Sequence, residues 1–280
     1  MTRRQRQHRT GEAVVAAGVA VCVCLGTGGC SGSDAVAEDA RGGDAVAVLR
    51  QAADRLLDAG SSKARTSMEM ATGGTRVTIR GEGVYDYRKR LGRLEVLLPQ
   101  DPAGAAPRRP ITELLAPGAL FMKNRGAGVP ADKWVRVDTG TVSDGNLVTG
   151  GATDPLAAAE VLRGTRTATY LGHTRIGGTE VRHYRGTADL GRAAKAATAA
   201  NRAPLEAAAK GFATAEVPFD AYLDDQGRIR KVRHRFSFVN GQHAKPVAVA
   251  STTLLYAFGA PARVRLPDED DIYAGKIAEE

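Results

Sequence analysis

The sequence predicts an α+β fold with about ten antiparallel strands and three or four helices. Most segments after residue 60 alternate apolar and polar residues with a period of two, which is the pattern of a strand buried on one face. Short polar turns separate these segments, and such turns favour an antiparallel sheet with one dry face. Alanine-rich or amphipathic helical segments between the strands supply the cover that a dry face needs.

The chain begins with a leader that ends in a cysteine. A basic start is followed by an apolar run over 13–25 and by the small residues Thr27, Gly28 and Gly29, directly before Cys30. A basic start, a short apolar run and small residues are typical of a secretory signal. A run of about 13 apolar residues is too short to span a bilayer, so we do not interpret it as a transmembrane anchor.

Residues 1–29 resemble the signal peptide of bacterial lipoproteins, in which the cysteine after the cleavage site is diacylated and becomes the first mature residue. The chain has three cysteines, two of them inside the leader, so cleavage would leave one thiol and no internal disulfide. We therefore predict lipidation at Cys30 and an anchor at the outer face of the cytoplasmic membrane. Thr27 replaces the usual aliphatic residue three places before the cysteine, so an ordinary cleaved signal is the alternative. Export through the general secretory route or, given the early arginine pair, the twin-arginine route is left open.

The mature chain is only modestly basic. The whole sequence carries a formal charge of +8, and removing the leader, with its four arginines and Glu12, leaves +5. No spacing typical of a nucleic-acid-binding motif is present, so we predict no nucleic-acid partner, whereas anionic lipid headgroups suit a weak positive charge. Residues 30–43 are small, polar and acidic without periodicity, which predicts a lipidated cysteine and a flexible tether ahead of one domain over 44–280.

The first helix is predicted over 44–59. Asp44 can cap it, Leu49 and Leu56 recur at helical spacing, and Gly60 can end it. One apolar stripe implies one buried face.

Two further helical regions follow. Asp154-Pro155 begins a short helix, with proline in its first turn and Gly164 at its end. Asp189 can cap an alanine-rich stretch that reaches Gly211, and we expect Pro204 to divide that stretch in two.

Strands are predicted where the alternation is clear, and loops where proline, glycine and polar residues gather at 99–110 and 138–153. Gly81 and Gly83 fall on the apolar face of one strand, where a missing side chain allows a bend or close packing. Asp224 to Gly227 form a hairpin turn, and the ligand spacing of a calcium loop is absent. The expected strands are 64–71, 75–87, 93–98, 118–123, 133–138, 167–173, 179–187, 217–223, 228–238 and 247–258.

The sequence gives little support for enzyme chemistry. It contains no HExxH, no zinc-type Cys/His cluster, no G-x-S-x-G and no phosphate-binding glycine loop. We therefore predict a protein that is not an enzyme, with no catalytic residue, no metal site and no cofactor. A wall-remodelling hydrolase is the least favoured alternative.

Three charged or titratable features have two interpretations each. Arginines and a lysine crowd residues 228–235, either as a solvated strand face or as a docking surface for anionic lipid or wall polymer. His234 lies within an apolar strand face, either as a core histidine with its hydrogen bonds satisfied or as a ligand contact. Residues 268–271 are all acidic, and a solvated surface segment is preferred to a weak cation site.

Several short motifs resemble the LppX/LprAFG family of actinobacterial lipoproteins. They are Tyr170-Leu171-Gly172-His173, then Gly177-Gly178, then His183-Tyr184-Arg185-Gly186 with Asp189-Leu190, then the run from Val217 to Asp225, Gly227-Arg228-Ile229 and the closing Tyr256-Ala257-Phe258-Gly259. The order of elements agrees over roughly residues 44–267. These motifs are hairpin and strand signatures, so they point to a fold more than to an activity.

The resemblance implies a structure like the carriers LolA and LolB: a strongly curved antiparallel half-barrel with helices on its concave side and an apolar cavity for acyl chains. It implies a membrane-anchored lipoprotein that binds or carries a lipid or lipidated molecule at the cell envelope. The alternative is a non-catalytic sensor or protein-docking module of the same fold with a filled core and an envelope protein partner, as in the half-barrel of the periplasmic sensor RseB. Candidate cavity residues are those that alternate onto the dry faces of long strands: Val77, Ile79, Phe219, Leu223, Phe236 and Phe238.

Overall fold

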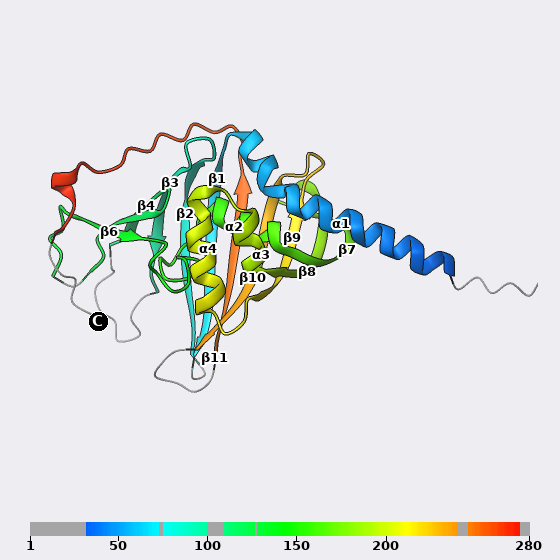
Figure 1. The fold of residues 1–280 in the computed structure, drawn as a ribbon. Helices are drawn as coiled ribbons and strands as arrows, with labels where there is room; N and C mark the ends of the chain where they lie inside the picture. Colours follow the sequence, from blue (N-terminus) through cyan, green and yellow to red (C-terminus); the bar gives the residue numbers. More distant parts are fainter. Residues whose placement is uncertain (1–31, 73–74, 100–108, 127, 240–245, 275–280) are drawn as a thin grey trace, which may run out of the picture.

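The computed structural model describes residues 32–72, 75–99, 109–126, 128–239 and 246–274 (Figure 1). The elements follow one another as α1 (Gly32–Ala59), β1 (Ser61–Thr72), β2 (Thr75–Asp86), β3 (Leu91–Leu97), β4 (Ile111–Ala116), β5 (Ala119–Lys123), β6 (Trp134–Asp138), α2 (Pro155–Val161), the 3-10 turn η1 (Leu162–Gly164), β7 (Thr165–Ile176), β8 (Thr179–Asp189), α3 (Leu190–Ala196), α4 (Ala199–Gly211), β9 (Glu216–Leu223), β10 (Ile229–Val239), β11 (Pro246–Tyr256) and η2 (Glu269–Asp271).

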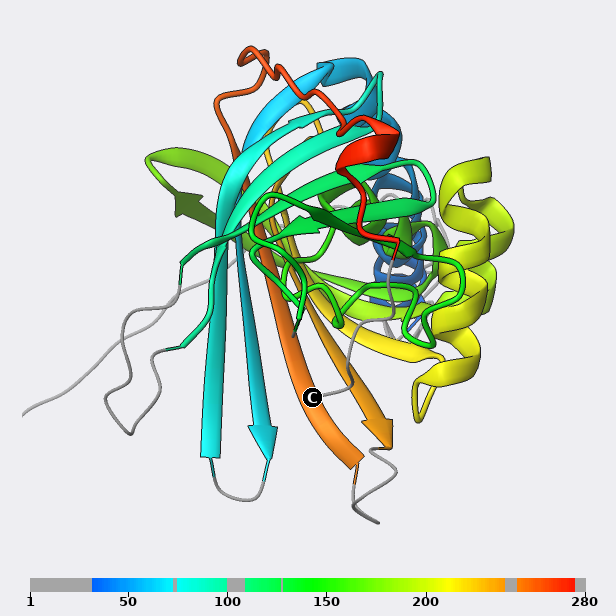
Figure 2. The same cartoon turned by 90° about the vertical axis from the view of Figure 1, so that its left-hand side faces the viewer.

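All strands of the described residues join one antiparallel sheet of eleven strands, in the order β6-β5-β4-β3-β2-β1-β11-β10-β9-β8-β7. The first and last strands pair at the centre, from Lys63 opposite Tyr256 to Ala71 opposite Ala248. The outer strands β6 and β7 do not pair with each other, so the sheet stays open. It is strongly curved (Figure 2), and the α+β half-barrel expected from the sequence is confirmed, with one strand more than expected.

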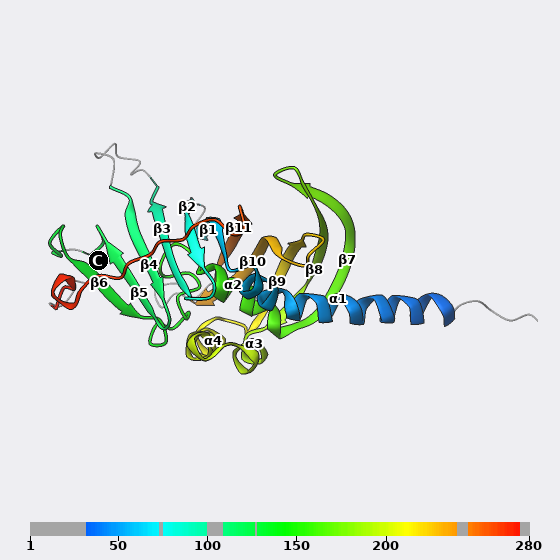
Figure 3. The same ribbon diagram turned by 90° about the horizontal axis from the view of Figure 1, so that it is seen from above.

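The helices lie on the concave side of the sheet. Seen from above, α2 sits within the concavity, and α3 and α4 lie across its open side (Figure 3). Helix α2 is buried along its whole length, from Pro155 to Val161. The largest hydrophobic cluster of the described residues lies between these helices and the sheet.

Helix α1 begins at Gly32, earlier than the start at Asp44 that the sequence predicts. Its N-terminal part projects beyond the sheet (Figures 1 and 3), continuing a helix whose stability comes from its other end. There Leu49, Ala52 and Leu56 are fully buried, as the helical spacing predicts. Because extending a helix costs little once it is nucleated, the helix can continue before Asp44.

Strand β4 is absent from the sequence-based prediction, and its environment explains why. Leu114 and Leu115 are both buried because β4 is covered on both faces. Leu114 belongs to a second hydrophobic cluster on the convex side, closed by Leu266 and Ile272 from the C-terminal segment. A strand buried on both faces loses its alternation, and Glu113 at an inward position obscures the pattern further.

The helical stretch after Asp189 breaks at Ala197-Thr198, and the expectation of a break at Pro204 is wrong. Pro204 lies inside α4. The buried carboxylate of Glu160 on α2 accepts hydrogen bonds from the backbone N–H of Thr198 (3.0 Å) and from the amide of Asn201 (2.6 Å). This contact fixes the start of α4 from a distant part of the chain.

Gly83 permits the tight approach of β2 and β3. A Cβ atom at this position would clash with the backbone carbonyl of Arg93 on β3. The sequence-based expectation of close packing at the glycines of this strand is therefore confirmed at Gly83.

Candidate functional site

The concave faces of the four central strands form an apolar surface, which we call the apolar floor. Cross-strand pairs build it: Met68 lies opposite Ile79, Met70 lies opposite Val77, and Phe236 lies opposite Val249. Its described members come from β1, β2, β10 and β11 and face the helices: Met68, Met70, Val77, Ile79, Phe236, Val247 and Val249.

The cover over the apolar floor decreases along the strands. Phe236 is buried, and its ring stacks on that of Phe212 after α4, with 4.9 Å between centroids. Ile79 is also buried, and a Cβ atom on Gly151 of the loop above it would come within 3.4 Å of its side chain. Toward the β1–β2 turn, Met70 and Val77 are only partly buried. The floor therefore has one covered end and one end that is partly exposed on its β1–β2 side, where Met70 and Val77 lie, while Val247 on β11 stays buried.

The candidate cavity residues fall into two groups. Val77, Ile79 and Phe236 lie on the apolar floor. Phe238 continues the same face of β10, opposite Val247, although its side chain lies outside the described residues.

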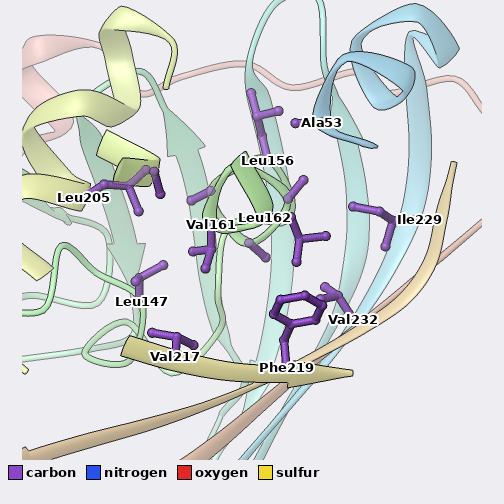
Figure 4. Close-up of a cluster of buried hydrophobic side chains, with 14 of the residues drawn as sticks. Ala53, Leu147, Leu156, Val161, Leu162, Leu205, Val217, Phe219, Ile229 and Val232 are labelled. Atoms are coloured by element: carbon purple, nitrogen blue, oxygen red, sulfur yellow. The ribbon is translucent and has the colours of Figure 1, made fainter. Parts of the chain in front are cut away.

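Phe219 and Leu223 lie on β9, beside the apolar floor, and are fully buried; Phe219 is opposite His234. Figure 4 shows the ring of Phe219 beneath Leu162 of η1 and beside Val232, so side chains from the helical layer fill this part of the concavity. Cys30, the predicted lipidation site, lies outside the described residues.

A band of polar side chains crosses the concave face where the apolar floor ends, and we call it the polar band. Thr66 on β1, Ser251 and Thr253 on β11 and His234 on β10 are adjacent in register and almost completely buried. Thr153, in the loop before α2, covers the band: its Oγ1 lies 2.6 Å from Ser251 Oγ and donates to the carbonyl of Leu147. The sequence pattern does not reveal this band, because its members become neighbours only when β1, β10 and β11 are placed in register.

His234 is a core residue, as the sequence favours, but its hydrogen bonds are not all satisfied. The ring is buried and stacks on Phe236 with 5.7 Å between centroids. Its Nε2 has no hydrogen-bond partner among the described residues. Burial lowers the pKa of His234 to about 3, so the imidazole is neutral at physiological pH.

Glu113 is the most unusual buried acid in the described part of the chain. It points to the concave side between Leu94 on β3 and Met122 on β5, with no exposed surface. Neither carboxylate oxygen has a hydrogen-bond partner among the described residues. Burial raises the pKa of Glu113 to about 8, although the charge of Arg125 acts in the opposite direction.

Asp154, which is only partly exposed, has structural partners. Asp154 caps α2 by accepting from the backbone N–H groups of Leu156 (2.7 Å) and Ala157 (3.0 Å), and Tyr85 donates to its other oxygen at 3.1 Å. Burial raises the pKa of Asp154 to about 6. These contacts orient α2 over the sheet.

Three of the five basic side chains over 228–235 form ion pairs with acids, among them Arg228 with Asp224 at 2.8 Å. On the convex face, Arg233 contacts Glu69 at 3.2 Å, and Arg235 contacts Asp220 at 2.6 Å. These ion pairs favour the interpretation as a solvated strand face over a docking surface for anions.

Asp220 is the centre of that convex cluster. His183 and Arg185 also bond to its carboxylate, at 2.9 and 3.0 Å. Burial alone would raise the pKa of Asp220, but the hydrogen bonds from Arg235, His183 and Arg185 outweigh it and hold the pKa at about 2. The carboxylate ties three strands together as a permanent anion.

Within the ranges that the structure covers, no three His, Cys, Asp or Glu side chains gather in a way that would hold a metal ion. In the same ranges, no helix combines the length and the apolar character needed to cross a bilayer.

No family model and no curated protein matches this sequence. Among solved structures, the chain is similar to the lipoprotein LppX of Mycobacterium tuberculosis, with 10% identity, a TM-score of 0.49, and coverage of 80% of this chain and 99% of that one. LprF of Mycobacterium bovis shares 13% identity, with a TM-score of 0.39 and coverage of 81% and 97%. A LolA superfamily protein of Nitrosomonas europaea shares 11% identity, with a TM-score of 0.33 and coverage of 82% and 97%. LppX and LprF carry the names of the family that the motifs of the sequence resemble.

Proposed function

We propose that this protein is an envelope lipoprotein that binds the acyl chain of a lipid or lipidated molecule on its apolar floor. The observation that carries the proposal is the partly exposed end of that floor. Met70 and Val77 face the concave side of the sheet but are only partly buried. An acyl chain that enters at this end would find apolar side chains already in position.

Burial of apolar area would supply the affinity. Each buried methylene contributes ~0.8 kcal/mol, so a chain of sixteen carbons could gain on the order of 10 kcal/mol before ordering costs. The free energy needed to move the loop that carries Gly151 away from Ile79 would offset part of that gain. No bond is made or broken in this function, and it requires neither a metal nor a cofactor.

The anchor is the second part of the proposal. Cys30 follows a leader typical of lipoproteins, and its acylation would hold the domain at the outer face of the cytoplasmic membrane. The binding face would then lie within reach of membrane lipids.

A protein-docking module of the same fold is the second candidate. It is favoured by the packing beside the apolar floor, where Phe219 and Leu223 on β9 are fully buried beneath the helices. A filled interior suits a rigid platform whose outer surface meets an envelope protein.

Binding of an acyl probe decides between the two candidates. We expect the full chain carrying Cys30→Ala, which lacks the anchor, to bind a fluorescent fatty acid saturably at one site. Native mass spectrometry of the same protein should show a lipid adduct that organic extraction removes. Absence of both saturable binding and adduct would reject the carrier and leave the docking module as the function.

A further inference from the structure

Two buried polar atoms of the polar band have no hydrogen-bond partner among the described residues. They are Thr66 Oγ1 on β1 and His234 Nε2 on β10. Between them lie Ser251 and Thr153, whose hydroxyls satisfy each other at 2.6 Å. Buried polar groups in native proteins almost always have a partner, so an unpaired one indicates a missing atom or a functional demand.

The two atoms lie in successive rows at the inner edge of the apolar floor: His234 is level with Ser251 and Met68, and Thr66 is level with Thr253 and Val232. Thr66 lies two residues before Met68, and His234 lies two residues before Phe236, so each pair shares one face of its strand. On β11 the same change from apolar to polar occurs between Val249 and Ser251. A chain that lay along the floor from its exposed end would therefore meet the polar band next.

We propose that the polar band recognises a hydroxyl group carried deep within the acyl chain of the ligand. The inference rests on the proposed function and adds the chemical class of the chain. A hydroxyl both donates and accepts, so it can pair with either tautomer of the His234 ring; Thr66 Oγ1 lies on β1, across β11 from His234, and would pair with a second hydroxyl. A plain hydrocarbon would leave both atoms unpaired.

The charge of the band argues against a carboxylate at this place. His234 is neutral because burial lowers its pKa to about 3. The neighbouring band residues are hydroxyls, and no cation of the described residues forms a hydrogen bond within the band. A buried carboxylate without a cationic partner is costly, so the ionised head of a fatty acid stays at the exposed end. From Met70 to Thr66 the strand advances ~13 Å at about 3.3 Å per residue, which places the recognised hydroxyl well down the chain.

The test compares 12-hydroxystearic acid with stearic acid on the full chain carrying Cys30→Ala. We expect the hydroxylated acid to bind about tenfold more tightly, which is the usual scale for satisfying one buried polar atom. His234→Phe and Thr66→Val retain most of the volume of each side chain, and His234→Phe, which removes the partner of the single chain hydroxyl, should reduce that preference while stearic acid still binds. The matched control is Thr252→Val, whose side chain lies on the convex face of β11 and should leave the preference unchanged.

A spectroscopic readout on the wild-type side chains keeps the test independent of variant folding. The Nε2 resonance of His234 should shift with 12-hydroxystearic acid and stay in place with stearic acid. Equal affinity for the two acids, or a preference that His234→Phe does not alter, overturns the hydroxyl inference while the lipid-binding function stands. If neither acid binds, both the inference and the proposed function fail.

Discussion

Thr153 and Ser251 join the helical layer to the centre of the sheet through a single pair of hydroxyls, with 2.6 Å between Oγ1 and Oγ. Thr153 precedes α2, and Ser251 lies on β11 in the middle of the half-barrel. Both residues are buried, so neither hydroxyl can exchange its partner for bulk water. The pair therefore holds the loop before α2 against the inner edge of the apolar floor.

Thr153→Val should destabilise the protein by about 1–3 kcal/mol, because it leaves Ser251 buried without its partner. Urea unfolding measures the loss. The double variant Thr153→Val with Ser251→Ala should lose less than the sum of the two single variants, since it leaves no unpaired hydroxyl at the contact. Additive losses would contradict a direct bond between the two side chains.

Glu113 should make the protein less stable as the pH rises toward 8. Its folded pKa of about 8 lies above its ordinary 4.5 because of burial, so the folded state keeps a proton that the unfolded chain has released. The unfolding free energy must therefore fall across that window. Asp154 and His234, with folded pKa values of about 6 and 3, change the unfolding free energy mainly below pH 6.5. As the pH rises, Asp154 lowers the unfolding free energy and His234 raises it.

The change Glu113→Gln isolates this effect, because glutamine does not titrate. Between pH 6.5 and 8 the wild-type protein should lose about 1–2 kcal/mol of unfolding free energy, and the variant should lose much less. Urea midpoints at the two pH values give the comparison, with Glu180→Gln on the exposed surface of β8 as the control. An identical slope in the wild type and in Glu113→Gln would refute the assignment.

Cys30→Ala should release the protein from the membrane fraction and abolish incorporation of labelled palmitate. One acyl chain gives only marginal binding, so a stable anchor needs the two or more chains that lipidation supplies. Cys24→Ala is the matched control, because that cysteine lies in the leader and should be lost on cleavage. Membrane retention of a processed Cys30→Ala protein would show that the anchor lies elsewhere.

The sequence was sufficient to predict most strands, because a strand buried on one face shows its alternation directly. It missed β4, where Leu114 and Leu115 are both buried and the inward position between Leu94 and Met122 is a glutamate. It also placed the helix break at Pro204, since the contact from Glu160 to Thr198 joins residues far apart in the chain. Local patterns carry no information about such contacts.

The candidate site was predictable only as a set of inward-facing side chains. Val77 and Phe219 show the same alternation, yet one is partly exposed and the other is fully buried under Leu162 (Figure 4). The difference depends on where the helices lie over the sheet. The polar band escaped prediction for a related reason, because Thr66 and His234 look like ordinary strand residues until β11 is placed between them.

A matched pair of charge insertions on β2 tests most directly whether the ligand binds on the apolar floor. Val77→Arg places a charge at the partly exposed end of the floor, and Thr78→Arg places the same charge one residue away on the convex face. Both positions have access to water, so both variants should fold.

The measurement is the dissociation constant of a fluorescent fatty acid, with each change made in the full chain carrying Cys30→Ala. Val77→Arg should weaken binding at least tenfold, because a bound acyl chain would remove water from an unpaired charge, and Thr78→Arg should bind like its parent. Equal affinities for the two folded variants would contradict binding on the apolar floor.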